Sequence, residues 1–293
     1  MTAPPSHIWT RRHWLGATAT ASLGLLGLAP RLSAAGLSRY RDRVLSKKPV
    51  GYWRLGEASG PTAKDESGFN RHGTFHGTPA LHQPGALQHD EDTSITLDGK
   101  ASYVEVRDDP AFSIATSGKG LTVEAWMRPD TLEFPGETKD PYIHWIGKGE
   151  LPQSEWAFRF YTHTSSRPNR ISAYAFNLAG GLGSGAYFED PLAAGQWIHV
   201  VATFDPPAKS NPKAGVSLYR DGVLRKGPAI PGSSGTLYSE YHVIPTHGTS
   251  PLRLGACDVN HEFLIGGLDE VAIYPQVLTA AEIHEHWMIG SKG

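Results

Sequence analysis

The stretch Leu-Thr-Val-Glu-Ala-Trp-Met-Arg-Pro, residues 121–129, alternates along its length between two sets of side chains. One set is entirely apolar and consists of Leu121, Val123, Ala125 and Met127. The other set consists of Thr122, Glu124, Trp126 and Arg128. Because successive side chains of a β-strand point to opposite faces of its sheet, this pattern predicts a strand with its apolar face in a core. Pro129, which has no backbone N–H, ends the strand.

Runs with similar alternation lie on both sides of this strand. They comprise residues 51–57, 94–98, 102–106, 156–161, 170–176, 197–204, 216–220, 252–255 and 263–274. The pair Asp221-Gly222, directly after one of these runs, is typical of the type I′ turn that joins two antiparallel strands. Between Gly51 and Tyr274 no helical pattern supplies the crossovers that a parallel sheet needs. The sequence therefore predicts an all-β fold, an antiparallel β-sandwich.

Helical signals lie only at the two ends of this region. Thr279-Ala-Ala-Glu282 is a capping box, in which a hydroxyl and a carboxylate bond to free backbone N–H groups at the start of a helix. We therefore predict one short C-terminal helix. Residues 37–48 are basic and compatible with a helix, which Pro49 would end.

The composition agrees with many short strands joined by turns. Of the 293 residues, 33 are Gly and 22 are Pro, about a fifth of the chain, against a background of roughly 12%. Both residues weaken helix interiors, which argues against a helical bundle, and the 10% of aromatic residues argues against a disordered chain. The formal charge of -2 lacks the basic surplus of proteins that bind nucleic-acid phosphates. Cys257 is the single cysteine, which excludes an intramolecular disulfide and a four-cysteine zinc site.

The N-terminal segment resembles a twin-arginine export signal. Arg11-Arg12 precedes an uncharged run over residues 14–29, and Ser33-Ala34-Ala35 supplies the small residues that a signal peptidase accepts. The run is shorter than the ~20 apolar residues of a membrane-spanning helix, and an uncleaved N-terminal anchor is the alternative. The sequence predicts a signal peptide over residues 1–35 and a single β-sandwich domain over residues 36–293. The exported domain would reside in the periplasm, in the cell envelope or outside the cell.

Eight segments follow one another in an order that resembles a known family. They are Y-W-R-L-G-E (52–57), D-E-S-G-F-N-R-H-G (65–73), I-T-L-D-G-K-A-S-Y-V-E-V (95–106), L-T-V-E-A-W-M-R-P (121–129), Q-W-I-H-V-V-A-T-F (196–204), L-Y-R-D-G (218–222), G-G-L-D-E-V-A-I-Y (266–274) and L-T-A-A-E-I (278–283). Together they resemble the laminin G-like domain of the concanavalin A-like lectin/glucanase superfamily. The resemblance implies a jelly roll of two curved antiparallel sheets. It also implies recognition of sugars or proteins on the concave sheet or its rim loops, sometimes with a calcium ion.

This fold carries lectins, glycosidases, lyases and adhesion modules, so particular residues must decide between them. Glycosidases of this superfamily place carboxylates in an E-x-D-x-x-E pattern on one strand, where two of them can flank a glycosidic bond. The chain does not contain that pattern, and the strand at 121–129 carries only Glu124, which we interpret as a structural ion pair with nearby Arg128. The sequence therefore favours a non-catalytic carbohydrate-binding module. A hydrolase or lyase with an unfamiliar site and a protein–protein adhesion module are the alternatives.

The histidines are candidates for a metal site or for catalysis. His72, His76, His82 and His89 crowd one segment at irregular spacing, where three of them could meet at a zinc ion. Solvated loop histidines are the favoured interpretation of this irregular group. We predict that His199, in the strand at 197–204, is a buried and hydrogen-bonded structural residue rather than a catalytic base.

Carbohydrate recognition needs flat aromatic faces in accessible segments. We interpret the Pro- and Gly-rich segment 133–155 as a long loop, and we predict that its Tyr142 and Trp145 stack on a sugar. The second candidates are Tyr187 and Phe188 in the Gly-rich stretch 178–195, and the third are Tyr238 and Tyr241. Loops of this length are usually functional or disordered. The alternative is that these aromatic residues pack the loops onto the sandwich.

The resemblance also implies a calcium site. Asp269 in G-G-L-D-E-V matches the position at which related sandwiches present a carboxylate to a structural calcium ion. Glu57 and Asp98 are candidate further ligands because each ends a predicted strand beside a glycine, and calcium takes about six to eight oxygen ligands. Two other interpretations compete with this one. Asp269 would cap a turn, or Glu270 would pair with Arg54.

We expect the exported protein to begin near Gly36, because cleavage after Ala35 removes the signal peptide. N-terminal sequencing of the exported fraction measures this directly. A sequence that begins at Met1 in that fraction would contradict the prediction.

Overall fold

The computed structural model describes residues 38–134, 141–150, 152–178, 183–205, 215–225, 234–237, 243–258 and 263–293, with the backbone alone for 234–237. The expected signal peptide, residues 1–35, lies outside the described residues. Within the described part of the chain, no helix has both the length and the apolar character needed to cross a bilayer.

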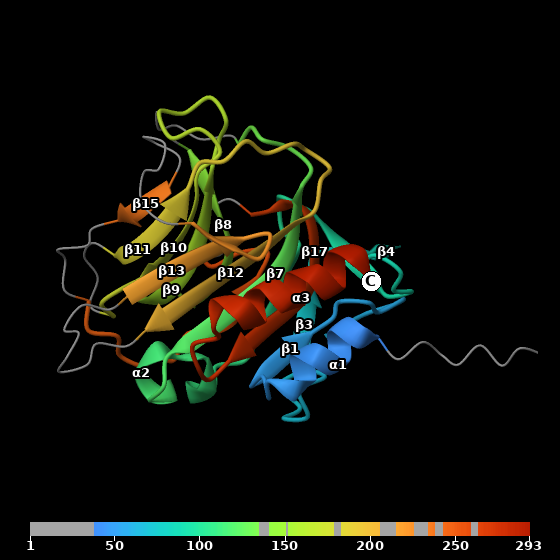
Figure 1. Cartoon of the computed structure of the whole chain (residues 1–293), viewed down its shortest axis with the longest axis horizontal. Coiled ribbons are helices and arrows are strands. Elements are labelled where there is room, and N and C mark those ends of the chain that lie inside the picture. The colour runs from blue at the N-terminus through green and yellow to red at the C-terminus, as the bar shows by residue number, and fades with distance from the viewer. Residues whose placement is uncertain are drawn as a thin grey trace, which may run out of the picture. The chain divides into compact units, whose positions relative to one another are not determined.

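Two antiparallel sheets form a β-sandwich, which confirms the predicted fold class (Figure 1). The eight-stranded sheet has the order β14-β13-β12-β7-β17-β5-β4, with β1 paired to β17. Its strands are β1 (Gly51–Trp53), β4 (Ala80–Pro84), β5 (Thr93–Asp98), β7 (Leu121–Pro129), β12 (Ile198–Asp205), β13 (Gly215–Arg220), β14 (Val223–Arg225) and β17 (Ile265–Tyr274). The nine-stranded sheet has the order β15-β11-β10-β9-β8-β16-β6-β3-β2. Its strands are β2 (Thr62–Ala63), β3 (Gly73–His76), β6 (Tyr103–Val106), β8 (Tyr142–Glu150), β9 (Gln153–Tyr161), β10 (Ile171–Ala175), β11 (Ser184–Phe188), β15 (Ser234–Leu237) and β16 (Leu252–Leu254).

The strand predicted at residues 121–129 is β7, a central strand of the eight-stranded sheet that pairs with β12 and β17. Its apolar odd-numbered residues pack in the core between the two sheets, in the same cluster as Phe158 and Phe160 of β9. Asp221 and Gly222 join β13 to β14 with φ angles of 50° and 72°, the positive values that a type I′ turn requires. The alternating pattern and the turn pair were therefore both correct predictors of local structure.

Two segments that we interpreted as loops contain strands. The segment 133–155 contains β8, and the Gly-rich stretch 178–195 contains β11. The loop interpretation was wrong because the alternation in these segments is interrupted. β8 shifts register against β9 between His144 and Ile146, so two core residues, Trp145 and Ile146, follow one another in the sequence. A bulge of this kind hides the period-two signal without ending the strand.

Two helices cover the outer face of the eight-stranded sheet (Figure 1). They are α1 (Arg39–Ser46) and α3 (Ala280–Lys292), and α3 begins at the predicted capping box of Thr279 and Glu282. Two short helical turns, η1 (Pro110–Phe112) and α2 (Ile114–Ser117), precede β7. The helices share a second hydrophobic core with the sheet, formed by Tyr40, Val44, Tyr52, Ala86, Leu87, Trp126, Val201, Tyr219, Ala272, Tyr274, Leu278 and Ile283. The central strands β7, β12 and β17 of the eight-stranded sheet are therefore buried on both faces.

The carboxylate of Glu124 lies at the centre of this second interface. The Tyr40 hydroxyl of α1 donates a hydrogen bond to Oε1 at 2.9 Å, and the Tyr274 hydroxyl of β17 donates to Oε2 at 2.7 Å. His199 Nε2 of β12 lies 2.7 Å from Oε1, and His286 Nδ1 of α3 lies 2.9 Å from Oε2. All five side chains are buried. We call this group the Glu124 network, and it joins both helices to three adjacent strands of the sheet, β7, β12 and β17.

Two expectations about this region have different outcomes. His199 is buried and hydrogen-bonded, which confirms its structural interpretation. The predicted ion pair of Glu124 with Arg128 is wrong, because the Arg128 guanidinium pairs with Asp130 at 2.7 Å instead. Burial by itself would raise the pKa of Glu124, but the charges and hydrogen bonds of His286 and His199 lower that pKa well below its ordinary value.

We expect Glu124→Ala to lower the free energy of unfolding by about 3–5 kcal/mol at neutral pH, because it leaves buried imidazole and hydroxyl groups unpaired. A carboxyl group with a lowered pKa in the folded state stabilises the protein above the pKa of the unfolded chain, about 4.3, and loses this effect as pH falls through its folded pKa. The difference in unfolding free energy between the variant and the unaltered protein should therefore become smaller as the pH is lowered. Urea unfolding at several pH values measures both effects.

Glu91→Ala is the matched control, because Glu91 is exposed and its loss should change the unfolding free energy by less than about 0.5 kcal/mol. If Glu124→Ala were as stable as this control at neutral pH, the Glu124 network would not hold the helices to the sheet.

Candidate functional site

Aromatic and charged side chains gather on the outer face of the nine-stranded sheet, over β8 to β11. The inward-facing residues of these strands fill the core: Ile143, Trp145, Phe158, Phe160, Ile171, Ala173, Ala175, Ala186 and Phe188. The residues that alternate with them must face outward. Among these, Tyr142, Arg159 and Tyr187 are partly exposed, as is Phe176 directly after β10. Since α1 and α3 pack on the other sheet, neither of these helices covers this face.

Arg159 of β9 is at the centre of a group that we call the arginine–tyrosine cluster, which consists of Tyr142, Arg159, Tyr161, Tyr174 and Phe176. The guanidinium carbon lies 4.6 Å from the ring centre of Tyr142 and 4.7 Å from that of Tyr174. The Phe176 ring centre lies 5.7 Å away. Arg159 Nε donates a hydrogen bond to Nε2 of His144, the residue of β8 with which it is paired, at 3.0 Å. These contacts on paired strands fix the guanidinium in one place, which is the preorganisation that a binding site needs.

The structure separates the two aromatic residues that were predicted to act together. Tyr142 lies on the outer face and belongs to the arginine–tyrosine cluster. Trp145 has no exposed surface and packs in the core, with its ring centre 5.0 Å from that of Phe158. The prediction of a sugar-stacking role for Trp145 was therefore wrong, because a strand rather than a loop carries it and sends its side chain to the other face.

The remaining predicted aromatic residues divide in the same way. Tyr187 of β11 is partly exposed on the outer face, and the Arg170 guanidinium carbon lies 3.9 Å from its ring centre. Phe188, the next residue, is fully buried in the core. Tyr238 and Tyr241 lie outside the described residues.

Arg159, Tyr174 and Phe176 were not among the residues predicted from the sequence. The alternation of W-A-F-R-F-Y (156–161) and R-I-S-A-Y-A-F (170–176) could have placed Arg159 and Tyr174 on the side away from the core. It could not have brought them together, because their contact depends on the register of β9 against β10, where Arg159 faces Ser172.

A hollow of about 520 Å³ lies near another part of the nine-stranded sheet. Its lining is mostly polar: His72, Thr74, Glu105, Arg107, Asp108, Thr249 and Pro251. Thr74 of β3 and Glu105 of β6 are neighbours across the sheet. Glu105 also accepts a hydrogen bond from Arg253 of β16 at 3.0 Å, and the other end of that guanidinium lies 2.7 Å from Glu150. Both carboxylates are therefore paired with the same guanidinium, that of Arg253.

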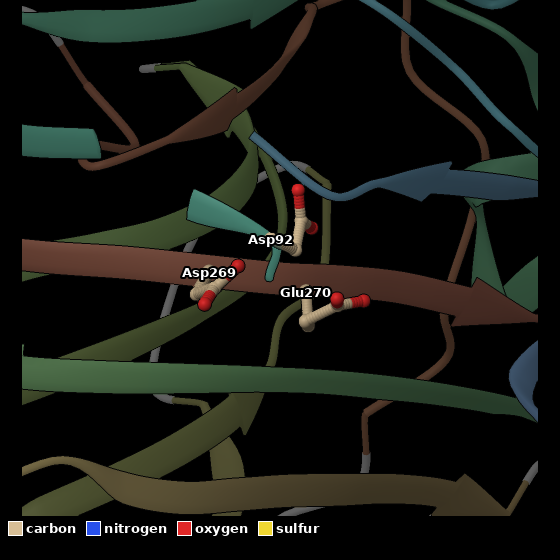
Figure 2. Close-up of side chains that lie close together, drawn as sticks. All are labelled: Asp92, Asp269 and Glu270. Atoms are coloured by element: carbon tan, nitrogen blue, oxygen red, sulfur yellow. The ribbon is translucent and has the colours of Figure 1, made fainter. Parts of the chain in front are cut away.

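A second candidate site lies at a bulge in β17. The register of β17 against β7 shifts between Asp269 and Ala272, and Glu270 has a φ of 51°. A bulge lets neighbouring residues leave the strict alternation of a strand. Figure 2 shows Asp269 and Glu270 on this strand with Asp92, the residue before β5, beside them. Carboxylate oxygens of the three lie within 4.8 Å of one another, and we call the three residues the acidic cluster.

One guanidinium partly neutralises the acidic cluster. Arg54 Nη2 lies 2.7 Å from Glu270 Oε1, and Arg54 Nε lies 2.9 Å from Asp92 Oδ2. The Tyr52 hydroxyl also donates a hydrogen bond to Glu270. Burial raises the pKa of Glu270 to about 8 although Arg54 acts against it, and burial together with the charge of Glu270 raises the pKa of Asp269 well above its usual value. The predicted pairing of Glu270 with Arg54 is confirmed.

The three predicted metal ligands lie in different surroundings. Asp269 belongs to the acidic cluster and accepts a hydrogen bond from Ala86 N at 2.7 Å through Oδ2, while its buried Oδ1 has no hydrogen-bond partner among the described residues. Glu57 is mostly buried, accepts from Lys64 N at 2.7 Å, and likewise leaves its buried Oε2 without such a partner. Burial, opposed by backbone hydrogen bonds and reinforced by the charge of Asp92, raises the pKa of Glu57.

Asp98 does not join the acidic cluster. It is exposed, and its Oδ1 accepts hydrogen bonds from the backbone N–H groups of Lys100, Ala101 and Ser102 at 2.9–3.1 Å. Although partial burial opposes it, this bonding lowers the pKa of Asp98 to about 2. Asp98 therefore closes the turn between β5 and β6.

The acidic cluster fits a hard cation. Calcium prefers carboxylate and carbonyl oxygens, and the unpartnered Oδ1 of Asp269 is a buried acceptor of this kind. The crowded histidines do not form a competing site. His72 Nδ1 accepts from Asp65 N at 3.0 Å, and His76 stacks on Tyr103 with ring centres 4.6 Å apart. Among the described residues, the acidic cluster is the only group of three or more His, Cys, Asp or Glu side chains whose ligand atoms are close enough to share a metal ion.

Comparison with known proteins identifies the family. A family model described as the concanavalin A-like lectin/glucanases superfamily matches residues 98–284, more than half of the chain. The chain therefore belongs to this superfamily. No curated protein matches the sequence.

Solved structures with the same fold have little sequence in common with this chain. Domain 4 of AbnA, an extracellular GH43 arabinanase of Geobacillus stearothermophilus solved with arabinotriose, matches with a TM-score of 0.54 and 17% identity, over 82% of this chain and 98% of that one. The botulinum neurotoxin DC binding domain in complex with SialylT matches with a TM-score of 0.55 and 12% identity, over 83% of this chain and 52% of that one. The binding domain of botulinum neurotoxin serotype C1 matches with a TM-score of 0.57 and 11% identity, over 83% of this chain and 52% of that one. The chain thus spans about half the length of these neurotoxin domains.

Proposed function

We propose that this chain is an exported, non-catalytic carbohydrate-recognition module that binds a glycan on the outer face of the nine-stranded sheet. The observation that carries this proposal is the arginine–tyrosine cluster, whose Tyr142, Arg159 and Phe176 are partly exposed on a face that α1 and α3 leave uncovered. Sugar rings pack their C–H faces on aromatic rings, and planar polar groups bind their hydroxyls. The cluster offers both kinds of group on adjacent strands.

The comparisons and the polar pairing support this proposal over its alternatives. Two structures with the same fold were solved in complex with a ligand, one with arabinotriose and one with SialylT. Glu105 and Glu150 are both paired with Arg253, an arrangement that suits a structural role better than proton transfer to a glycosidic oxygen. A hydrolase or lyase and a protein–protein adhesion module are outcomes that the binding experiment below distinguishes.

We also propose a structural calcium ion at the acidic cluster, held by Asp269 and Asp92, with Glu57 as a further ligand. Calcium would neutralise carboxylates that one guanidinium, that of Arg54, leaves partly uncompensated. The bound ion would tie the β17 bulge to the segment before β5. Its contribution would be stability rather than chemistry, because Asp269 and Glu270 are fully buried and Arg54 and Tyr52 already contact Glu270.

The proposed export by the twin-arginine route rests on the sequence. Arg11-Arg12, the uncharged run and the small residues before Gly36 carry this part of the proposal.

We expect a glycan array to identify oligosaccharides that the domain binds, and Tyr142→Ala and Tyr187→Ala each to weaken that binding about three- to tenfold. The reason is that one aromatic contact contributes about 0.5–1.5 kcal/mol beyond the area it buries. Isothermal titration calorimetry with the bound oligosaccharide measures the change.

Phe69→Ala is the control, because Phe69 is an exposed aromatic residue (57% exposed) between β2 and β3, which lie at the other end of the nine-stranded sheet from β8 to β11. Its loss should leave affinity unchanged. Chromatography of the oligosaccharide after long incubation tests for hydrolysis or elimination. Shortened products would favour the enzyme, and an array without any bound glycan would contradict the proposed function.

We expect calcium to raise the melting temperature and a chelator to lower it, because an ion that binds only the folded state stabilises that state. Asp269→Asn should abolish this response, whereas Asp98→Asn should keep it, since Asp98 serves a turn. Differential scanning calorimetry with calcium chloride and with EDTA measures the shift. A calcium response that Asp269→Asn leaves intact, or no response in the unaltered protein, would refute the site.

A further inference from the structure

Arg159 differs from other arginines of the sandwich in what surrounds its charge. Arg128, Arg170 and Arg253 each pair with a carboxylate, at 2.7 Å from Asp130, 2.6 Å from Glu189 and 3.0 Å from Glu105. Arg159 is partly buried, yet its described neighbours are tyrosine and phenylalanine rings and the imidazole of His144. Among the residues that the structure describes, no carboxylate forms an ion pair with it.

The contacts of Arg159 leave one part of its guanidinium for a ligand. Nε is used by His144, and the rings of Tyr142 and Tyr174 lie close to the group. The Tyr161 hydroxyl is a further hydrogen-bond partner of the guanidinium. The Nη edge of the planar fork, with which no carboxylate of the described residues pairs, suits the two oxygens of a carboxylate. A guanidinium stays charged at all physiological pH values, so its partial burial has an electrostatic cost that a bound anion would remove.

We propose that the glycan recognised on this face is acidic, and that Arg159 binds the carboxylate of a uronic or sialic acid type of sugar through its Nη atoms. This inference rests on the proposed function and assigns its ligand class. The neighbouring rings of Tyr142 and Phe176 would contact the apolar faces of the same sugar or of the next one. A sulfate ester shares the negative charge but not the planar shape, so it is the weaker ligand.

The size of the expected effect follows from the type of bond. A hydrogen bond to a charged group contributes about 1.5–3 kcal/mol, which corresponds to a roughly 10- to 100-fold change in affinity. Added sodium chloride should weaken the acidic ligand more than its neutral counterpart, because salt screens the attraction between partly exposed charges.

The experiment compares matched oligosaccharides on the unaltered domain by calorimetry. Oligogalacturonate and oligoglucuronate are each paired with their carboxyl-reduced form, and sialyllactose is paired with its desialylated form. A sulfated neutral oligosaccharide is the fourth probe. We expect at least one acidic member to bind about 10- to 100-fold more tightly than its neutral counterpart, and more tightly than the sulfated probe.

Two variants test whether Arg159 is responsible for the preference for the acidic sugar. Arg159→Met should remove the preference for the acidic member, and Arg159→Lys should restore part of it, because a lysine keeps the charge but not the fork. Arg128→Met is the matched control and should keep the preference. Like Arg159, Arg128 extends from a strand and stacks on an aromatic ring, 5.0 Å from the ring centre of Trp197, but a carboxylate already neutralises it.

The outcomes separate this inference from the proposed function. Equal binding of acidic and neutral members, or a preference that Arg159→Met keeps, would overturn the inference while glycan recognition stands. Tightest binding of the sulfated probe would overturn the assignment of a carboxylate. No binding to any probe or to any glycan on the array would overturn both. If Arg159→Met does not fold, as its circular dichroism would show, the matched pairs on the unaltered domain still decide the question.

Discussion

The arrangement of this molecule depends on one buried carboxylate. Glu124 lies in the middle of β7 without contact to solvent, and a charge in that position must be surrounded by hydrogen-bond donors. Its donors come from Tyr40 near the start of the described chain, from His286 near its end, and from two neighbouring strands. These bonds hold α1 and α3 on the same sheet. The helices thereby cover the outer face of that sheet, and the recognition surface that we propose lies on the other sheet.

The two sheets consequently use the same alternation for different purposes. In the central strands β7, β12 and β17 of the eight-stranded sheet both sets of side chains are buried, one against the opposing sheet and one against the helices. In the nine-stranded sheet the inner set packs in the core, and among the outward-facing residues of β8 to β11, Tyr142, Arg159 and Tyr187 are partly exposed. A rigid sheet that presents aromatic rings and a fixed guanidinium loses little conformational entropy on binding.

Local patterns in the sequence predicted much of the fold and little of the site. The alternation over 121–129 and the capping box at Thr279 depend on near neighbours, so they could be recognised without a structure. The bulge in β8 concealed a strand and led to the wrong location of Trp145. The neighbours of Arg159 and the partners of Glu124 come from distant segments, and only the strand register and the packing of the helices bring them together. The motif around Asp269 indicated a carboxylate site, but its neighbour Asp92 was not among the predicted ligands.

A crystal structure of the domain with its tightest-binding oligosaccharide tests the central claim most directly. The account predicts that the sugar lies on the outer face of the nine-stranded sheet, in contact with the Tyr142 ring and within hydrogen-bond distance of the Arg159 Nη atoms. A sugar bound in the hollow beside Glu105 and Thr249, or against α3, would contradict the claim that the outer face of β8 to β11 is the recognition surface.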